Sequence, residues 1–157
     1  MDLEKFTERS RGFLQAAQTI AMRENHQRLV PGHLLKAIID DEDGLASNLI
    51  ARAGGSPERV KQAVDMAVSK LPKVSGDAGQ LYLDPSMGRV LDEAEKVAKK
   101  AGDSFVPVER VLMALAMVKS KAKEAMDAGA VNAQALNAAI NDIRGGRTAD
   151  TASAEDT

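Results

Sequence analysis

The sequence of 157 residues contains no cysteine and no tryptophan, and its aromatic side chains are limited to one tyrosine and three phenylalanines. Without cysteine, the chain can form neither disulfide bonds nor thiolate metal sites, which fits a reducing compartment. β-Sheets usually draw on aromatic and β-branched side chains, whereas small aliphatic side chains let helices pack closely. The composition therefore predicts an all-helical fold.

Long apolar runs and a strong excess of one charge are also missing. No stretch approaches the ~20 apolar residues of a membrane span, and the acid-containing start MDLEKFTERSRGF does not resemble a signal peptide. The net charge of −2 is far from the basic balance of a nucleic-acid-binding domain. We therefore expect a cytoplasmic chain that binds neither membranes nor nucleic acids.

Enzyme motifs are absent as well. The sequence has no Gly-Lys pair, hence no phosphate-binding loop GxxxxGK[ST], and it has no GxSxG serine elbow. The acidic run at 40–43 is predicted to end a helix, because it lacks the alternation of a calcium loop. Two histidines cannot close a zinc site; we expect His26 to be solvated and His33 to make a structural contact. The chain is thus predicted to be no enzyme and to hold no cofactor or metal.

Apolar residues recur at helical spacing through most of the chain, which predicts eight helices. The first four are expected at about 3–23, 31–40, 45–53 and 57–70. A loop with glycine and proline follows at 71–83, and four more helices are expected to begin near 85, 107, 119 and 132.

The two sets of helices are related in sequence. A shift of 76 positions places Pro31 on Pro107 and Gly12 on Gly88. A glycine inside a helix is unfavourable relative to alanine, so the matching pair predicts a close helix crossing at equivalent points. The registered prolines, glycines and apolar positions predict an internal duplication.

These patterns define the expected organisation of the chain. One compact domain is predicted over 1–146, made of two pseudo-symmetric four-helix repeats at about 3–71 and 83–146. The polar tail, 147–157, has no apolar anchor. Its composition predicts a flexible linker.

Five segments carry a resemblance to a known family. In chain order they are LEKFT, VPGHLLKAI, AGG, LPKV with the glycine-rich loop after it, and AGDSFVPVERVLMAL. Together they resemble the Clp amino-terminal repeat (Clp R) domain over about residues 1–146. The LEKFT start and the LPKV-glycine loop favour the branch of bacterial disaggregases. The alternative is the adaptor-docking domain of protease-associated unfoldases such as ClpA and ClpC.

The resemblance implies a substrate-engaging domain of an ATP-dependent disaggregase. Such chaperones are cytoplasmic AAA+ hexamers that act with the DnaK system on unfolded or aggregated proteins during recovery from heat stress. Their ATP-binding modules lie outside the region of resemblance. The implied partners are unfolded or aggregated clients, the rest of the hexamer and the DnaK system, and the isolated domain is expected to be a monomer.

The resemblance also implies a client-binding groove. The matching positions are Thr7, Asp103 and Glu109 on its polar edge and Leu91 on its apolar side. Arg110 stands where some relatives are apolar, so it either pairs with an acid or shortens the apolar floor. Asp103 is expected to be solvated in a loop, and Glu109 falls in the first turn of a helix, where the dipole favours an acid. Each acid could instead serve the loop or the helix structurally, and Thr7 could instead be an exposed residue of the first helix. A rim of carboxylates would favour clients with basic residues.

Overall fold

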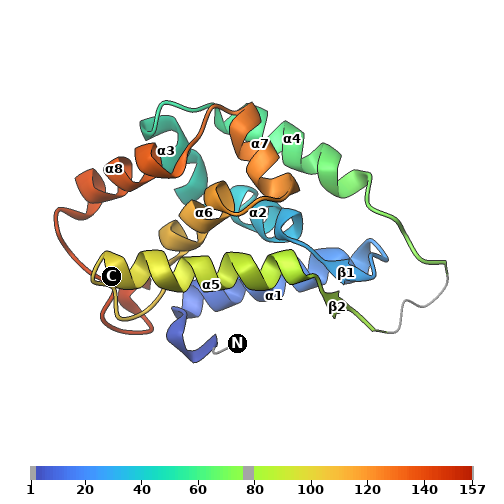
Figure 1. The fold of residues 1–157 in the computed structure, drawn as a ribbon, viewed down its shortest axis with the longest axis horizontal. Helices are drawn as coiled ribbons and strands as arrows, with labels where there is room; N and C mark the ends of the chain where they lie inside the picture. Colours follow the sequence, from blue (N-terminus) through green and yellow to red (C-terminus); the bar gives the residue numbers. More distant parts are fainter. Residues whose placement is uncertain (1–2, 76–79, 157) are drawn as a thin grey trace.

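A computed structural model describes residues 3–75 and 80–156 (Figure 1). Within these residues the chain forms eight α-helices, two short 3-10 helices and two strands of two residues each. In chain order the elements are η1 (Leu3–Lys5), α1 (Glu8–Arg23), β1 (Arg28–Leu29), α2 (Pro31–Ile39), α3 (Leu45–Arg52), α4 (Pro57–Ser69), β2 (Tyr82–Leu83), α5 (Pro85–Lys100), α6 (Val108–Met117), α7 (Lys121–Ala128), α8 (Ala133–Arg144) and η2 (Ala154–Asp156).

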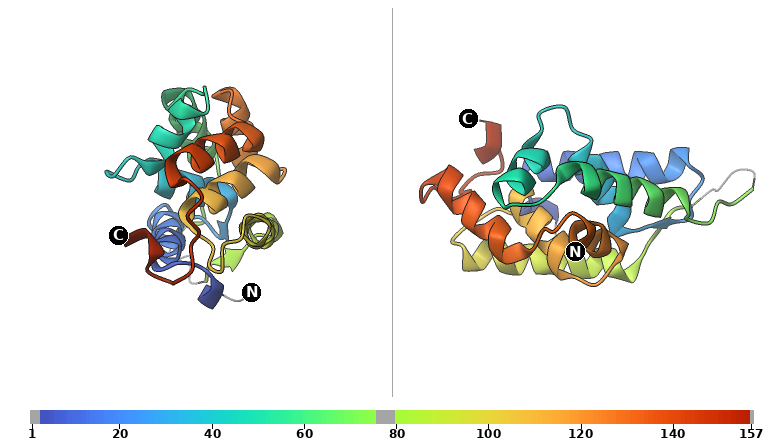
Figure 2. Two further views of the ribbon diagram at one scale, coloured as in Figure 1. Left: turned by 90° about the vertical axis from the view of Figure 1, so that its left-hand side faces the viewer. Right: turned by 90° about the horizontal axis from the view of Figure 1, so that it is seen from above.

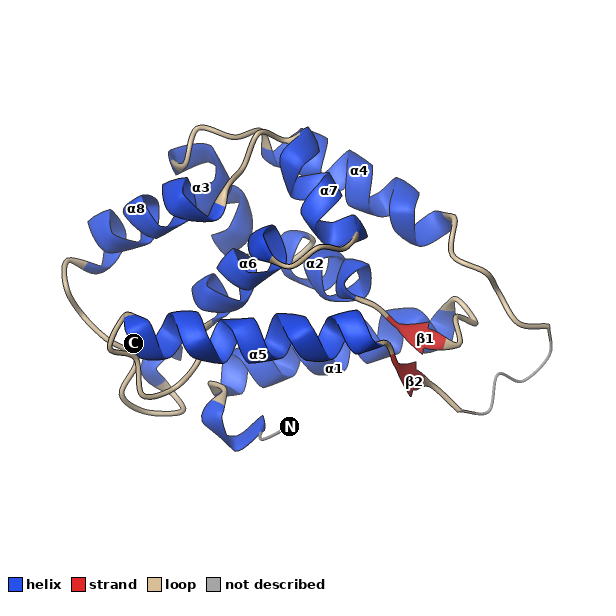
Figure 3. Cartoon of the chain, in the orientation of Figure 1, coloured by secondary structure: helices blue, strands red, loops and turns tan. Residues whose placement is uncertain are grey.

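The all-helical prediction with eight helices is confirmed (Figure 3). The first helix begins later than predicted, at Glu8, because the residues before it pair with the segment in front of α6. Phe6 forms a parallel bridge with Val106. The short strands β1 and β2 were not predicted from the sequence, and they pair in parallel.

Helices α2 and α6 lie at the centre of the molecule (Figures 1 and 2). Helix α1 packs on α2 and α5 packs on α6, while α3 packs on α8 and α4 packs on α7. The last two helices of each repeat therefore pack against those of the other repeat, which fits the predicted pseudo-symmetry. Among the described residues, no helix is long and apolar enough to cross a membrane.

Two equivalent backbone pairings join the repeats. The N–H of Thr7 donates to the carbonyl of Val106 (3.1 Å), and the N–H of Asp84 donates to the carbonyl of Leu29 (3.0 Å). Thr7 and Asp84 are 77 positions apart, as are Leu29 and Val106. Each pairing ties the start of the first helix in one repeat to the start of the second helix in the other.

The predicted close crossing at Gly12 is wrong. Gly12 is exposed on α1, and a Cβ atom built there has no neighbour within 4 Å, whereas Gly88 is half-buried. The close approach between the repeats lies instead at Gly129, after α7. A Cβ atom at Gly129 would clash with the side chain of Val60 and lie 2.8 Å from the carbonyl oxygen of Ser56. The N–H of Ser56 also donates to the carbonyl of Gly129 (2.8 Å).

We expect Gly129→Ala to lower the free energy of unfolding by roughly 1–3 kcal/mol, because the added methyl group overpacks this contact. Gly12→Ala is the matched control and should raise stability by about 0.5–1 kcal/mol, because alanine loses less backbone entropy in an exposed helix. Urea denaturation of both variants and the parent measures the two effects. Equal midpoints for the two variants would contradict this account of the repeat contact.

The expectation that His26 is solvated is also wrong, since His26 is 2% exposed and His33 is fully buried. The Nδ1 atom of His26 lies 2.9 Å from Nε2 of His33, and Nδ1 of His33 accepts the N–H of Val30 (3.1 Å). Because Nδ1 of His33 is an acceptor, the ring proton must be on Nε2, which donates to His26. Burial, together with the nearby His26, lowers the pKa of His33 to about 4. Burial lowers the pKa of His26 as well.

The neutral histidine pair predicts loss of stability in acid. The unfolded chain binds a proton at His33 with the ordinary histidine pKa of 6.5, against about 4 in the folded chain. Stability is therefore lost as the pH falls from 6.5 toward 4. We expect the free energy of unfolding to drop by ~2 kcal/mol between pH 8 and pH 5 from this residue. Urea denaturation across that range should show a smaller drop in His33→Gln, which keeps a donor and an acceptor but does not titrate. Identical pH dependence in both proteins would refute the assignment.

Candidate functional site

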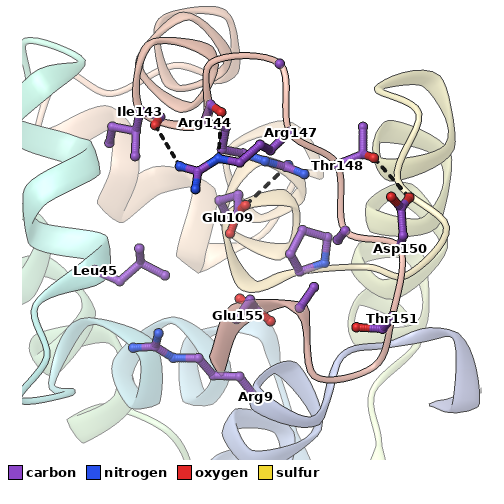
Figure 4. A pocket seen from close by; sticks show the side chains of 14 residues that line it. Arg9, Leu45, Glu109, Ile143, Arg144, Arg147, Thr148, Asp150, Thr151 and Glu155 are labelled. Carbon is purple, nitrogen blue, oxygen red and sulfur yellow. Dashed lines mark hydrogen bonds and ion pairs between the residues drawn. The ribbon is translucent and has the colours of Figure 1, made fainter. Parts of the chain in front are cut away.

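A cleft of about 660 Å³ lies beside the N-terminal ends of α1 and α6 and the C-terminal end of α8 (Figure 4). The helices and the residues at their ends contribute six residues to the wall of the cleft: Arg9, Leu45, Pro107, Glu109, Ile143 and Arg144. Residues 147–156, named here the C-terminal segment, contribute much of the remaining wall. Ile143 is 43% exposed, so the cleft presents apolar surface to solvent beside its charged groups.

Asp103 lies next to the cleft with its side chain fully buried. It accepts two hydrogen bonds from Arg144 (2.6 and 3.0 Å), one from Arg110 (3.3 Å) and one from the N–H of Ala149 (2.8 Å). Asp103 is thus not solvated as predicted, because these donors replace water around the carboxylate. Burial alone would raise the pKa of Asp103. The hydrogen bonds from Arg144 and Ala149 and the two guanidinium charges outweigh burial and hold that pKa below its usual value.

Arg110 lies in α6 and is 3% exposed. Besides its pair with Asp103, its Nη1 donates to Oδ1 of Asn137 (2.8 Å) and contacts Sδ of Met113 (3.1 Å). Of the two possibilities considered for Arg110, pairing with an acid is the one observed. Its guanidinium is therefore committed to the interior and does not line the cleft.

Thr7 and Leu91 are both buried. Thr7 caps α1, since its hydroxyl oxygen accepts the N–H of Ser10 (3.2 Å). Leu91 is 2% exposed on α5 and belongs to the hydrophobic core. Its side chain supports the packed interior and is not available to a ligand in this structure. The exposed apolar surface at the cleft comes instead from Ile143.

Glu109 stands at the rim, with its side chain 13% exposed, and pairs with Nη1 of Arg144 (3.3 Å). Burial raises the pKa of Glu109, and the charge of Glu155 adds to the rise, although Arg144 opposes it. Glu155 itself accepts the N–H of Val108 (3.0 Å) and contacts the hydroxyl of Thr7. The structure therefore brings Thr7, Glu109 and the Asp103 network together around the start of α6.

The acidic side chains of this site do not form a rim of unpaired carboxylates, because they are ion-paired with arginines. Asp103 is enclosed by two arginines, and Glu109 is paired with one of them. Across the cleft, Arg9 pairs with Asp41 (3.4 Å) and Asp43 (3.2 Å). The structure therefore does not support the predicted preference for clients with basic residues, which assumed unpaired carboxylates. Among the described residues, no group of three or more histidines and acids is arranged to hold a metal ion.

Arg144, Ala149 and Glu155, which contact the predicted site residues, were not selected from the sequence. Arg144 lies 41 positions from the carboxylate that it binds, and no local pattern signals such a pair. Ala149 and Glu155 belong to the tail that composition assigned to a linker. In the structure, Ala149 is 3% exposed, and its carbonyl accepts the N–H groups of Ser104 and Phe105 (both 2.9 Å). The tail is thus packed on the domain through its backbone, an interaction that a search for apolar anchors does not detect.

Comparisons with known proteins identify the family. The family profile of the Clp repeat (R) N-terminal domain matches residues 5–129. The chaperone protein ClpB of Mesorhizobium japonicum is 55% identical over 156 residues, which cover 99% of this chain and 18% of that protein. The Hsp104 N-terminal domain from Candida albicans superposes with a TM-score of 0.83 at 22% identity, over 96% of this chain and 99% of that one. A ClpV N-domain in complex with a VipB peptide gives 0.71 at 18% identity, over 96% of each chain.

The chain therefore belongs to the Clp repeat (R) N-terminal domain family. Within this family it is similar in sequence to chaperone protein ClpB, and it shares the fold of the Hsp104 N-terminal domain. The predicted resemblance is confirmed. The chain spans 18% of the length of the ClpB relative.

Asp103→Asn should lower the free energy of unfolding by about 3–5 kcal/mol, because it leaves the buried Arg110 without its counter-charge. Glu109→Gln, which removes one ion pair at the rim, should cost less than about 1 kcal/mol. Urea denaturation at neutral pH compares the two. Because the pKa of Asp103 is lowered on folding, its contribution is present above the ordinary pKa and is lost as the pH falls through the folded value. A similar cost for both variants would show that Asp103 is not the centre of the network.

Proposed function

We propose that this domain binds unfolded or aggregated polypeptide for an ATP-driven disaggregase, and that the cleft beside α1, α6 and α8 is the client site. The observation that carries the proposal is the position of the cleft. It combines an exposed apolar side chain, Ile143, with the residues around Thr7 and Glu109 that the family resemblance implied. A further support is the ClpV N-domain, a neighbour in fold that is known in complex with a peptide.

The chemistry of the cleft suits weak and sequence-tolerant binding. Apolar contact with Leu45, Pro107 and Ile143 is non-directional, so many client sequences can use it. A disaggregase must release what it binds, so we expect dissociation constants in the micromolar to millimolar range, about −4 to −8 kcal/mol. The proposal further places the chain in the cytoplasm, next to the ATP-binding modules of a hexamer that cooperates with the DnaK system.

The test uses reduced, carbamidomethylated α-lactalbumin, which stays unfolded, as the client. We expect titration into the isotope-labelled domain to shift the signals of Ile143 and Leu45. Ile143→Asp should weaken binding by roughly tenfold or more without unfolding the domain, because it replaces exposed apolar surface with a charge. Met66→Asp is the matched control, since Met66 is 59% exposed on α4, outside the cleft, and it should bind like the parent.

Shifts that cluster on the acidic turn at 40–43, or equal binding by both variants, would refute the cleft as the client site. Binding of a folded adaptor protein in the absence of any binding of the unfolded client would favour the docking domain of a protease-associated unfoldase.

A further inference from the structure

The C-terminal segment places the carboxylate of Glu155 against the N–H of Val108, at the start of α6, and the hydroxyl of Thr7. These two donors are named here the carboxylate seat. Glu155 accepts the N–H of Val108, the first residue of α6, at 3.0 Å, and its other oxygen contacts the hydroxyl of Thr7. The first N–H groups of a helix have no partner inside the helix, and the helix dipole favours an anion there. The segment thus satisfies a donor that the helix leaves open.

The rest of the segment is held by its main chain and by the Arg147 side chain, which donates to the carbonyls of Arg144 (3.0 Å) and Ile143 (3.4 Å). The N–H of Ala149 donates to Asp103 (2.8 Å), and its carbonyl accepts the N–H of Ser104 (2.9 Å). The carbonyl of Ala152 accepts the N–H of Glu8 (2.8 Å). Any polypeptide can make such bonds. Within the described part of the segment, these contacts require a small residue where Ala149 is buried and a carboxylate six positions later.

The first repeat lacks this seat although it has the same backbone. The starts of the first two helices in each repeat and the backbone pairings relate the repeats by 77 positions, one more than the shift of 76 predicted from the sequence. The position equivalent to Val108 is therefore Pro31, and Pro31 has no N–H to donate. The position equivalent to Thr7 is Asp84, whose charge would repel a carboxylate. The corresponding cavity, about 200 Å³, is lined by residues that include Val30, Pro31 and Asp84. The carboxylate seat is therefore a property of the second repeat alone, and it does not follow from the fold.

We propose that the C-terminal segment is a built-in competitor of clients: through Glu155 and its main chain it holds the carboxylate seat in the wall of the client cleft, and a client that takes this seat must displace it. This inference rests on the proposed function. It also names a class of client that can take the same seat: segments with a small residue followed six positions later by an acidic residue.

The tether explains how weak contacts suffice for competition. A segment joined to α8 by a short connection acts at an effective concentration in the millimolar range. A client of micromolar to millimolar affinity then binds only in proportion to the fraction of domains whose segment is released. Removal of the Glu155 carboxylate should raise that fraction, because hydrogen bonds to a charged acceptor are stronger than those to a neutral one.

The first experiment follows release of the segment without any client. In the parent domain, hydrogen exchange measured by NMR should show protection of the N–H groups of Val108 and Ala149. Glu155→Ala should speed exchange at both by roughly tenfold. Glu58→Ala is the matched control, since Glu58 is an exposed acid in the first turn of α4, and it should leave both rates unchanged.

A second variant removes the donor in place of the acceptor. Val108→Pro copies the first repeat, and proline is tolerated at the first position of a helix. The preceding Pro107 has φ −82° and ψ 168°, which the residue before a proline can adopt. Exchange at Ala149 should speed up in this variant as well.

The second experiment measures how tightly the parent domain and its variants bind the unfolded α-lactalbumin client. Glu155→Ala and Val108→Pro should bind it roughly three- to tenfold more tightly than the parent does, and Glu58→Ala should match the parent. A synthetic peptide of residues 147–157, added in trans, should displace the client from Glu155→Ala.

The outcomes separate the two ideas. Unchanged exchange in both variants would overturn the seat at Val108, and release of the segment without a gain in client affinity would overturn the competition. Failure of every variant to bind the client, including those with a released segment, would instead overturn the proposed function.

Discussion

The buried carboxylate of Asp103 joins four parts of the chain at one point. It stands in the loop before α6 and binds α6 through Arg110, the end of α8 through Arg144, and the C-terminal segment through the N–H of Ala149. A buried charge is stable only while its charged partners stay in place, so the two arginines hold the loop, α6 and the end of α8 in a fixed arrangement. The C-terminal segment contributes only the neutral N–H of Ala149, and the arginines still pair with Asp103 when the segment is released. The cleft lies among the same parts, and its shape depends on this one ion-pair centre. Arg144 extends the network to the rim by pairing with Glu109.

The internal duplication creates two equivalent surfaces, one in each repeat. The side chains at equivalent positions of these surfaces differ. Where the second repeat has Glu109 facing Arg144, the first has Gly32, whose Cβ position would lie 3.5 Å from Val68. The donor at Val108 has Pro31 as its counterpart. One surface has become a small pocket of about 200 Å³, and the other a cleft of about 660 Å³ with ion pairs in its wall. The backbone pairings that join the repeats were kept on both sides, because they hold the helices in place whatever the side chains do.

The helices could be predicted because their signals are local: apolar spacing, prolines at first turns and capping residues lie within a few positions of one another. The site could be predicted only in part. Thr7, Glu109 and Arg110 were found through resemblance, but the burial of Asp103 depends on Arg144, 41 positions away, and a loop position alone suggested solvation. His26 was misassigned for the same reason, since its partner His33 comes from another element. Gly12 shows the opposite error, in which a coincidence of register suggested a contact that is absent.

The composition that made the tail look like a linker also suits it to cover a binding site reversibly. A segment rich in apolar side chains would close the cleft too firmly for a weak client to displace it. Beyond the bonds of Arg147 to the adjoining end of α8, the C-terminal segment buries little except Ala149 and relies on main-chain bonds and one carboxylate, so it can be released at modest cost. Its low hydrophobicity keeps it from forming a core of its own when released, and its tether brings it back. Weak intrinsic affinity and high local concentration are together what a displaceable competitor requires.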